Sequence, residues 1–253
     1  MRISPGLQKS LIIWDYKIIQ MSIAENIEKT EERITKACMR SGRKREDITL
    51  MAVTKFMPLE AVTEAWDAGI RCFGESRVQE AVSKLDGFRT EHPGAELHLI
   101  GALQRNKAKT AAAFFDCIQS IDRVSLAEEL AKHAGGRNGP LPVLLELKTG
   151  EDSKSGFESP EALFSAVELI LACPTLRIHG LMTLAPNTAE EAPVRGAFRK
   201  LVIAGRELER RFPNQPGHGF TCLSMGMSGD FETAIEEGST MLRIGGAIFG
   251  ERI

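Results

Sequence analysis

The chain is poor in features that mark several classes of protein. Its 253 residues include one tyrosine, two tryptophans and five cysteines, and the cysteines form no Cys-x-x-Cys pair. Scattered cysteines of this kind are typical of reduced thiols, so we expect a cytoplasmic protein without a disulfide framework. The five histidines are equally dispersed, and neither residue type clusters at the spacing of metal ligands, so we expect no metal site.

Charge and hydropathy exclude further classes. The formal net charge is -2, which gives no reason to expect nucleic acid or an anionic membrane as a partner. No apolar stretch is long enough to cross a bilayer. With 43% hydrophobic and 26% charged residues, the chain can build one large core, and we expect it to act as a monomer.

The sequence changes character near residue 21. Ser22 with Glu25 three residues later is the signature of a helix N-terminus. We therefore expect residues 1–21 to be an N-terminal extension and residues 22–253 to form the domain. The extension is either an ordinary arm or an extra helical turn, or translation begins at Met21, and the sequence leaves these alternatives open.

Strand and helix patterns alternate along the rest of the chain. Strands are predicted at residues 48–55, 71–75, 97–103, 117–121, 143–147, 178–184, 222–227 and 241–245. Helices are predicted at residues 23–41, 59–68, 78–85, 125–133, 160–172, 190–212 and 231–237, and another begins near residue 106. Eight such units in about 200 residues are typical of a single (β/α)₈ TIM barrel in the α/β class.

An open doubly wound sheet is the alternative architecture. It would place a glycine-rich dinucleotide loop after the first strand, and none is present there. The run from Gly245 to Gly250 resembles such a loop only loosely, since no βαβ unit follows it. The barrel is therefore favoured.

Lys55 closes the apolar run that starts at Ile48, and Pro58 follows three residues later. This pattern predicts a buried strand whose last side chain is a lysine at the C-terminal mouth, where barrel active sites form. Burial favours the neutral amine, which is a nucleophile suited to a Schiff base. From this run alone, a lysine that extends to solvent is the more ordinary interpretation.

The segments after the last two strands favour a phosphate site. Ser224 and Ser228 precede a predicted helix, and Arg243 is followed by Gly245 and Gly246. Serine hydroxyls, close backbone amides and helix N-termini bind phosphate, and barrels often place such sites after strands seven and eight. Each residue also has an ordinary interpretation, as a helix cap, a tight-packing glycine or a surface arginine.

Together with Lys55, this cradle favours a phosphorylated aldehyde, and pyridoxal 5′-phosphate (PLP) fits that description. Five segments in chain order then resemble the pyridoxal phosphate homeostasis protein family, which is related to the N-terminal barrel of alanine racemase. The segments are 51–55, 73–80, 98–107, 223–228 and 238–250, and the resemblance runs from Ile23 to Arg252.

The resemblance implies a fold-type III barrel that holds PLP on Lys55. It also implies phosphate contacts and an arginine near the pyridine nitrogen or the phosphate. The residues in these roles are Ser224 and Ser228, the backbone amides of Gly245 and Gly246, and Arg243. Family members usually carry asparagine where this chain has Ser76, which is shorter and lacks the amide, and the role of Glu75 stays open.

Two functions compete, an amino-acid racemase and a PLP-binding protein. Racemisation needs two opposed acid/base groups, of which Lys55 supplies one. In alanine racemases the other is a tyrosine from a C-terminal domain, whereas this chain ends soon after Gly245 and its only tyrosine is Tyr16. Arg243 stays protonated and weakens the ring as an electron sink, a feature that alanine racemases share.

We therefore expect a protein of PLP homeostasis, without catalytic residues, that stores, buffers or delivers the cofactor. Apo PLP enzymes are the expected protein partners. The racemase is kept as the alternative function.

Overall fold

The computed structural model describes residues 21–150, 155–213, 215 and 218–250. The N-terminal extension expected at residues 1–21, with Tyr16, lies outside these residues except for Met21. Among the described residues, no helix combines the length and the apolar character that a bilayer crossing needs.

Within these residues, parallel strands form a closed barrel in the order β1-β2-β3-β4-β5-β6-β7-β8. Met51 on β1 pairs with Cys72 on β2 and with Arg243 on β8, so the first strand joins the last. The strands are β1 Thr49–Val53, β2 Cys72–Glu75, β3 Glu96–Leu99, β4 Cys117–Ile121, β5 Leu141–Glu146, β6 Leu176–Met182, β7 Cys222–Ser224 and β8 Met241–Ile244. The closed order confirms the predicted TIM barrel.

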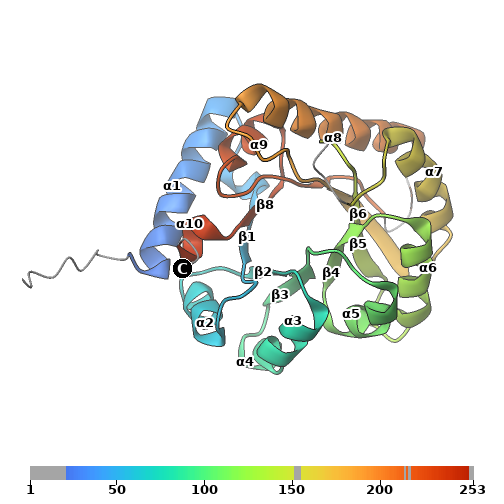
Figure 1. Cartoon of the computed structure of the whole chain (residues 1–253), viewed down its shortest axis with the longest axis horizontal. Coiled ribbons are helices and arrows are strands. Elements are labelled where there is room, and N and C mark those ends of the chain that lie inside the picture. Colours follow the sequence, from blue (N-terminus) through green and yellow to red (C-terminus); the bar gives the residue numbers. More distant parts are fainter. Residues whose placement is uncertain (1–20, 151–154, 214, 216–217, 251–253) are drawn as a thin grey trace, which may run out of the picture.

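Helices surround the barrel (Figure 1). They are α1 Ile23–Ser41, α2 Leu59–Asp67, α3 Val78–Leu85, α4 Phe88–Glu91, α5 Ala108–Phe114, α6 Val124–His133, α7 Pro160–Leu171, α8 Glu191–Arg211, α9 Phe231–Glu237 and α10 Gly246–Phe249, with 3₁₀ turns η1 Arg45–Asp47 and η2 Arg105–Lys107. The sequence did not predict the short helices α4 and α10. Both are single turns, too short to show an amphipathic period.

Helix α1 begins as predicted. Ser22 Oγ accepts a hydrogen bond from the Glu25 amide at 3.2 Å, and Glu25 Oε2 accepts one from the Ser22 amide at 2.8 Å. The helix ends at Gly42, whose φ of 69° suits a residue without a Cβ. Asn26 Nδ2 donates to the Ile248 carbonyl at 3.0 Å and so ties α1 to α10, and the two helices lie side by side in Figure 1.

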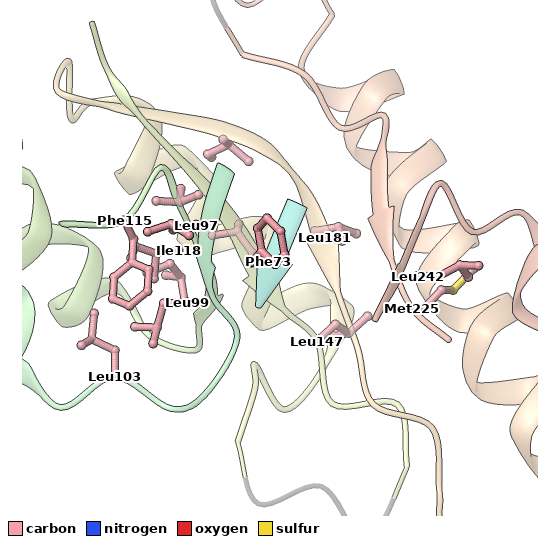
Figure 2. Close-up of a cluster of buried hydrophobic side chains, with 14 of the residues drawn as sticks. Phe73, Leu97, Leu99, Leu103, Phe115, Ile118, Leu147, Leu181, Met225 and Leu242 are labelled. Atoms are coloured by element: carbon pink, nitrogen blue, oxygen red, sulfur yellow. The ribbon is translucent and has the colours of Figure 1, made fainter. Parts of the chain in front are cut away.

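Two apolar layers build the core. The outer layer lies between strands and helices, and Figure 2 shows part of it, where Leu97, Leu99, Phe115 and Ile118 gather beside β3. The inner layer is rich in sulfur. It contains Met51, Cys72, Cys117, Leu144, Met182, Cys222 and Met241. These cysteines are buried free thiols, as the sequence predicted.

Several strands end earlier than predicted. β1 ends at Val53 instead of Lys55, β3 at Leu99 instead of residue 103, and β7 at Ser224 instead of residue 227. After β3 and β7 the apolar pattern continues past the end of the ladder, because the loops at the C-terminal mouth also line a cavity with apolar residues such as Ile100 and Met227. β1 is instead followed by Thr54 and Lys55 in a turn.

Candidate functional site

A cavity of about 660 Å³ opens at the C-terminal ends of the strands. This volume lies within the range of small-molecule sites. Of the residues predicted for the site, the structure brings to its walls Lys55, Ser228, Arg243, Gly245 and Gly246. They reach the same cavity because parallel strands of a barrel all direct their C-terminal ends to one face.

Lys55 lies in a turn two residues beyond β1. The Met57 amide donates to the Thr54 carbonyl at 2.9 Å and closes the turn. Lys84 Nζ, from α3, donates to the same Thr54 carbonyl at 2.8 Å and to the Met57 carbonyl at 3.1 Å. The expectation that Lys55 ends the strand is therefore wrong by two residues, although its side chain still lines the cavity.

The residue after Lys55 carries backbone strain. Phe56 has a φ of 66°, which is rare for an aromatic residue and costs about 1–3 kcal/mol. Its amide donates to Glu80 Oε1 at 3.0 Å, and the Arg77 guanidinium lies 5.3 Å from its ring centre. These contacts offset the strain and help to fix the turn that presents Lys55.

Glu75 stabilises the turn that contains Lys55 through contacts with Thr54 and Lys84. Its carboxylate is buried, and Lys84 Nζ lies 2.6 Å from its Oε1 atom. Thr54 Oγ1 donates to the same oxygen at 2.7 Å. The sequence left the role of Glu75 open. In the structure, Glu75 pairs with Lys84, and Lys84 in turn binds the carbonyls of the turn that contains Lys55.

Ser76 lines the cavity at the position where the resemblance expects asparagine. The backbone here is tightly packed, since a Cβ added at Gly101 would lie only 2.2 Å from the Ser76 carbonyl oxygen. Gly101 therefore allows the β2 and β3 loops to approach each other at the cavity wall.

Arg243 is the buried cation of the site, with 4% of its surface exposed. Nη1 donates to Ser224 Oγ and Nη2 donates to the Thr183 carbonyl, each at 2.7 Å. Burial lowers the pKa of the guanidinium to about 10, against an opposing effect of Asp230 and Glu146. The side chain therefore stays positively charged at neutral pH. The two oxygens that it binds, on Ser224 and Thr183, are neutral. A hydrogen-bond acceptor of a ligand in the cavity would therefore interact favourably with this charge.

Ser224 lies beneath the cavity instead of on its wall. It is fully buried at the end of β7, accepts from Arg243 and donates to Gln119 Oε1 at 2.7 Å. Gln119 Nε2 in turn contacts His98 Nδ1 at 2.8 Å. The structure thus places Ser224 in a polar chain that orients Arg243, and its direct contact with a phosphate stays a prediction.

Ser228, Gly245 and Gly246 form one wall of the cavity. Ser228 Oγ accepts a hydrogen bond from the Ala247 amide at 3.1 Å. A Cβ added at Gly246 would lie 3.9 Å from Ser228 Oγ, so the glycine leaves open the space between the serine and the start of α10. Backbone amides, a hydroxyl and free space are what a phosphate group needs.

Glu146 is a cavity residue that the sequence reasoning missed. It ends β5, has 2% of its surface exposed and lines the cavity. Burial raises the pKa of its carboxyl, although the hydrogen bond from Ser155 Oγ at 2.7 Å opposes this effect. A signal was present, because Glu146 interrupts the apolar run 143–147, as Lys55 closes the run of β1.

The chain is similar to known proteins along most of its length. The family described as "Alanine racemase, N-terminal domain" matches residues 23–253. A protein of Vibrio cholerae, named pyridoxal phosphate homeostasis protein, is 43% identical over 234 residues, which cover 91% of this chain and 97% of the relative. The relative carries the name of a homeostasis protein and not of an enzyme.

Solved structures agree with the fold. PipY of Synechococcus elongatus, with PLP bound, is 35% identical with a TM-score of 0.78, and the match covers 90% of this chain and 100% of PipY. An alanine racemase of Clostridium difficile is 12% identical with a TM-score of 0.71, covering 90% of this chain and 57% of the racemase. The second likeness supports the fold alone. With its barrel, its cavity and these relatives, the chain belongs to the pyridoxal phosphate homeostasis protein family.

Proposed function

We propose that the chain binds PLP as a Schiff base on Lys55 and serves to store, buffer or deliver it. The observation that carries the proposal is one cavity with Lys55 on its β1 side and Ser228, Arg243 and Gly246 on its β7 and β8 side. A phosphorylated aldehyde matches these two walls. The amine of Lys55 can react with the aldehyde, and the wall with Ser228 and Gly246 can bind the phosphate.

Different residues of the cavity bind different groups of PLP in this proposal. When bound, PLP supplies an aldehyde that condenses reversibly with an amine. The turn held by Lys84 presents Lys55 Nζ, and Ser228 with the backbone at Gly245 and Gly246 receives the phosphate. Arg243 places a fixed positive charge at the cavity floor and favours an unprotonated ring nitrogen.

Delivery of the cofactor extends the proposal. The printed names of the relatives, such as that of the Vibrio cholerae protein, refer to homeostasis. A reversible bond in a cavity open at the barrel mouth suits exchange with small molecules or with apo PLP enzymes. Water exclusion, which catalysis usually exploits, is correspondingly weaker in an open mouth.

An amino-acid racemase is the second candidate function, and Glu146 is the observation in its favour. Glu146 and Lys55 both line the cavity, and a raised pKa suits a carboxyl to acid/base work. The names of the relatives favour the binding protein.

The test is an absorbance spectrum of the purified protein before and after borohydride reduction, with mass mapping of the adduct. We expect the reduced cofactor on Lys55 and none in Lys55→Ala. Lys55→Arg is the matched control, because it keeps the positive charge and cannot form an imine. A covalent adduct in Lys55→Ala after reduction would refute the assignment.

The same preparation separates the two functions. Holo-protein is incubated with a panel of L-amino acids, and D-isomers are followed by chiral chromatography. We expect negligible turnover. Racemisation of one amino acid at about 1 per second or faster, abolished in Glu146→Gln, would establish the enzyme instead.

A further inference from the structure

A second cavity, of about 850 Å³, opens at the opposite end of the barrel, where the strands begin. Among the residues that line it are Glu96, His98 and Cys117. This face lies away from the cofactor cavity, and the proposed function does not use it.

Three potential metal ligands meet here, and two of them, Glu96 and His98, line this cavity. The ligating atoms of Cys72, Glu96 and His98 all lie within 4.8 Å of one another. The barrel register explains the meeting: Cys72 on β2 pairs with Glu96 on β3. His98 is two residues further along β3, so its side chain points to the same face of the strand as that of Glu96.

The distances suit a tetrahedral ion. Two nitrogen or oxygen ligands of zinc, each about 2.1 Å from the metal, lie roughly 3.4 Å apart at the tetrahedral angle. His98 Nε2 and Glu96 Oε2 are 3.5 Å apart. The Cys72 thiol lies within 4.8 Å of a ligating atom of each of the other two residues, and with a Zn–S bond of about 2.3 Å the thiol completes a tetrahedral site when that separation is roughly 3.6 Å.

The burial of the three residues also fits a metal site. Cys72 and His98 are buried at 4% and 6% exposure, whereas Glu96 is exposed and forms the route to solvent. An imidazole, a thiolate and a carboxylate together form a donor set that zinc accepts. From these contacts we propose that Cys72, Glu96 and His98 bind a divalent zinc-like cation, with a fourth position open to the cavity.

Gln119 provides the outer contact that metal-binding histidines require. Its Nε2 atom lies 2.8 Å from His98 Nδ1, and His98 Nε2 faces Glu96 Oε2 at 3.5 Å, so with the amide placed as the donor a neutral imidazole carries its proton on Nε2. Metal at Nε2 moves this proton to Nδ1, and a 180° rotation of the Gln119 amide then presents its oxygen as the acceptor, while Gln119 Nε2 turns toward Ser224 Oγ in place of the bond that Oε1 now accepts. The thiol proton of Cys72 is released to solvent on binding.

Sequence spacing could not reveal this site. Cys72 and Glu96 are far apart in the chain and lie on different strands, so they form none of the local patterns by which zinc sites are recognised. The expectation of no metal site came from that spacing, and the proposal rests on the barrel register instead.

The experiment is a titration of the metal-stripped full chain with Zn²⁺ and, separately, with Co²⁺. We expect one equivalent of zinc to bind and the cobalt form to show a thiolate charge-transfer band. Cys72→Ala should lose the band and weaken zinc binding roughly 100-fold or more, and Cys117→Ala, which removes a neighbouring buried thiol, should leave both unchanged.

Two further variants keep the result interpretable. Glu96→Gln changes an exposed side chain, and as the loss of a ligand it should weaken zinc binding by about tenfold or more, since the loss of an outer contact alone has that cost. Lys55→Ala should bind zinc like the wild type, so failure of the metal proposal and failure of the cofactor proposal remain distinguishable. Absence of stoichiometric zinc binding by the wild type, or equal binding by Cys72→Ala, would overturn the proposal.

Discussion

Removal of Lys84 should destabilise the barrel and loosen the turn that carries Lys55. Lys84 Nζ lies 2.6 Å from Glu75 Oε1, and the exposed fractions of the two side chains are 12% and 1%. Lys84→Met keeps the length of the stem and removes the charge, so it leaves a buried carboxylate without its partner. Breaking a buried pair in this way costs about 3–5 kcal/mol.

The expected loss can be converted into a melting temperature. For a domain of this size, 1 kcal/mol shifts Tm by about 2–4 °C, so Lys84→Met should lower Tm by roughly 6–20 °C. The Thr54 and Met57 carbonyls also lose their hydrogen bonds from Lys84. Each of these bonds contributes about 1 kcal/mol, and without them the turn presents Lys55 less firmly. We therefore expect PLP affinity to fall on the order of tenfold or more.

A double-mutant cycle separates the pair from its surroundings. Glu75→Gln removes the carboxylate charge while its amide oxygen can still accept from Thr54. In Lys84→Met/Glu75→Gln both charges are absent, so we expect the double variant to be more stable than Lys84→Met alone, with a coupling energy of about 2–3 kcal/mol. Urea unfolding followed by circular dichroism measures each corner. Strict additivity, or a loss below about 1 kcal/mol in Lys84→Met, would refute the reasoning.

Two further predictions concern the cavity walls. Arg243→Ala should weaken PLP binding more than Ser228→Ala, because a charged hydrogen bond contributes about 1.5–3 kcal/mol and a neutral one about 0.5–1.5 kcal/mol; equal dissociation constants would contradict the placement of Arg243. Glu146→Gln should be more stable relative to wild type at pH 7 than at pH 4. Burial raises the pKa of Glu146 in the folded protein above its ordinary value of 4.5. The wild type therefore loses stability as the pH rises from that ordinary value through the folded-state pKa, whereas the glutamine of the variant does not titrate. Urea unfolding at about pH 4 and pH 7 measures this difference, and a pH-independent difference would contradict it.

The sequence predicted the barrel and the position of most of the cavity. Alternating apolar runs and helical periods are local signals, and the closed barrel follows from their number. Lys55, Arg243 and Gly246 could be assigned to one mouth because each lies at or near the C-terminal end of a strand, and in a barrel these strand ends share a face. Their roles toward PLP remain predictions.

Other features depend on register between strands, which a single sequence does not specify. The depth of Ser224 below the cavity follows from its bonds to Gln119 and Arg243, two residues on other strands. The meeting of Cys72 with His98 has the same origin. The end of β1 was misplaced because the turn that follows it is shaped by Lys84 on another element, and no local pattern around Lys55 contains that contact.

The pairing of β1 with β8 has a consequence for biosynthesis. Among the described strands, β1 beside the Lys55 turn is the first to be translated, while β8, which pairs with β1 and supplies Arg243, is the last. Until then the edge of β1 has no partner on that side, and such edges promote aggregation. A ligand that contacts both walls can bind only after closure, and at 100 times its Kd it would stabilise the closed barrel by about 2.7 kcal/mol. If PLP is that ligand, as proposed, it would also favour maturation of the protein, and cells short of PLP would accumulate less of the folded chain.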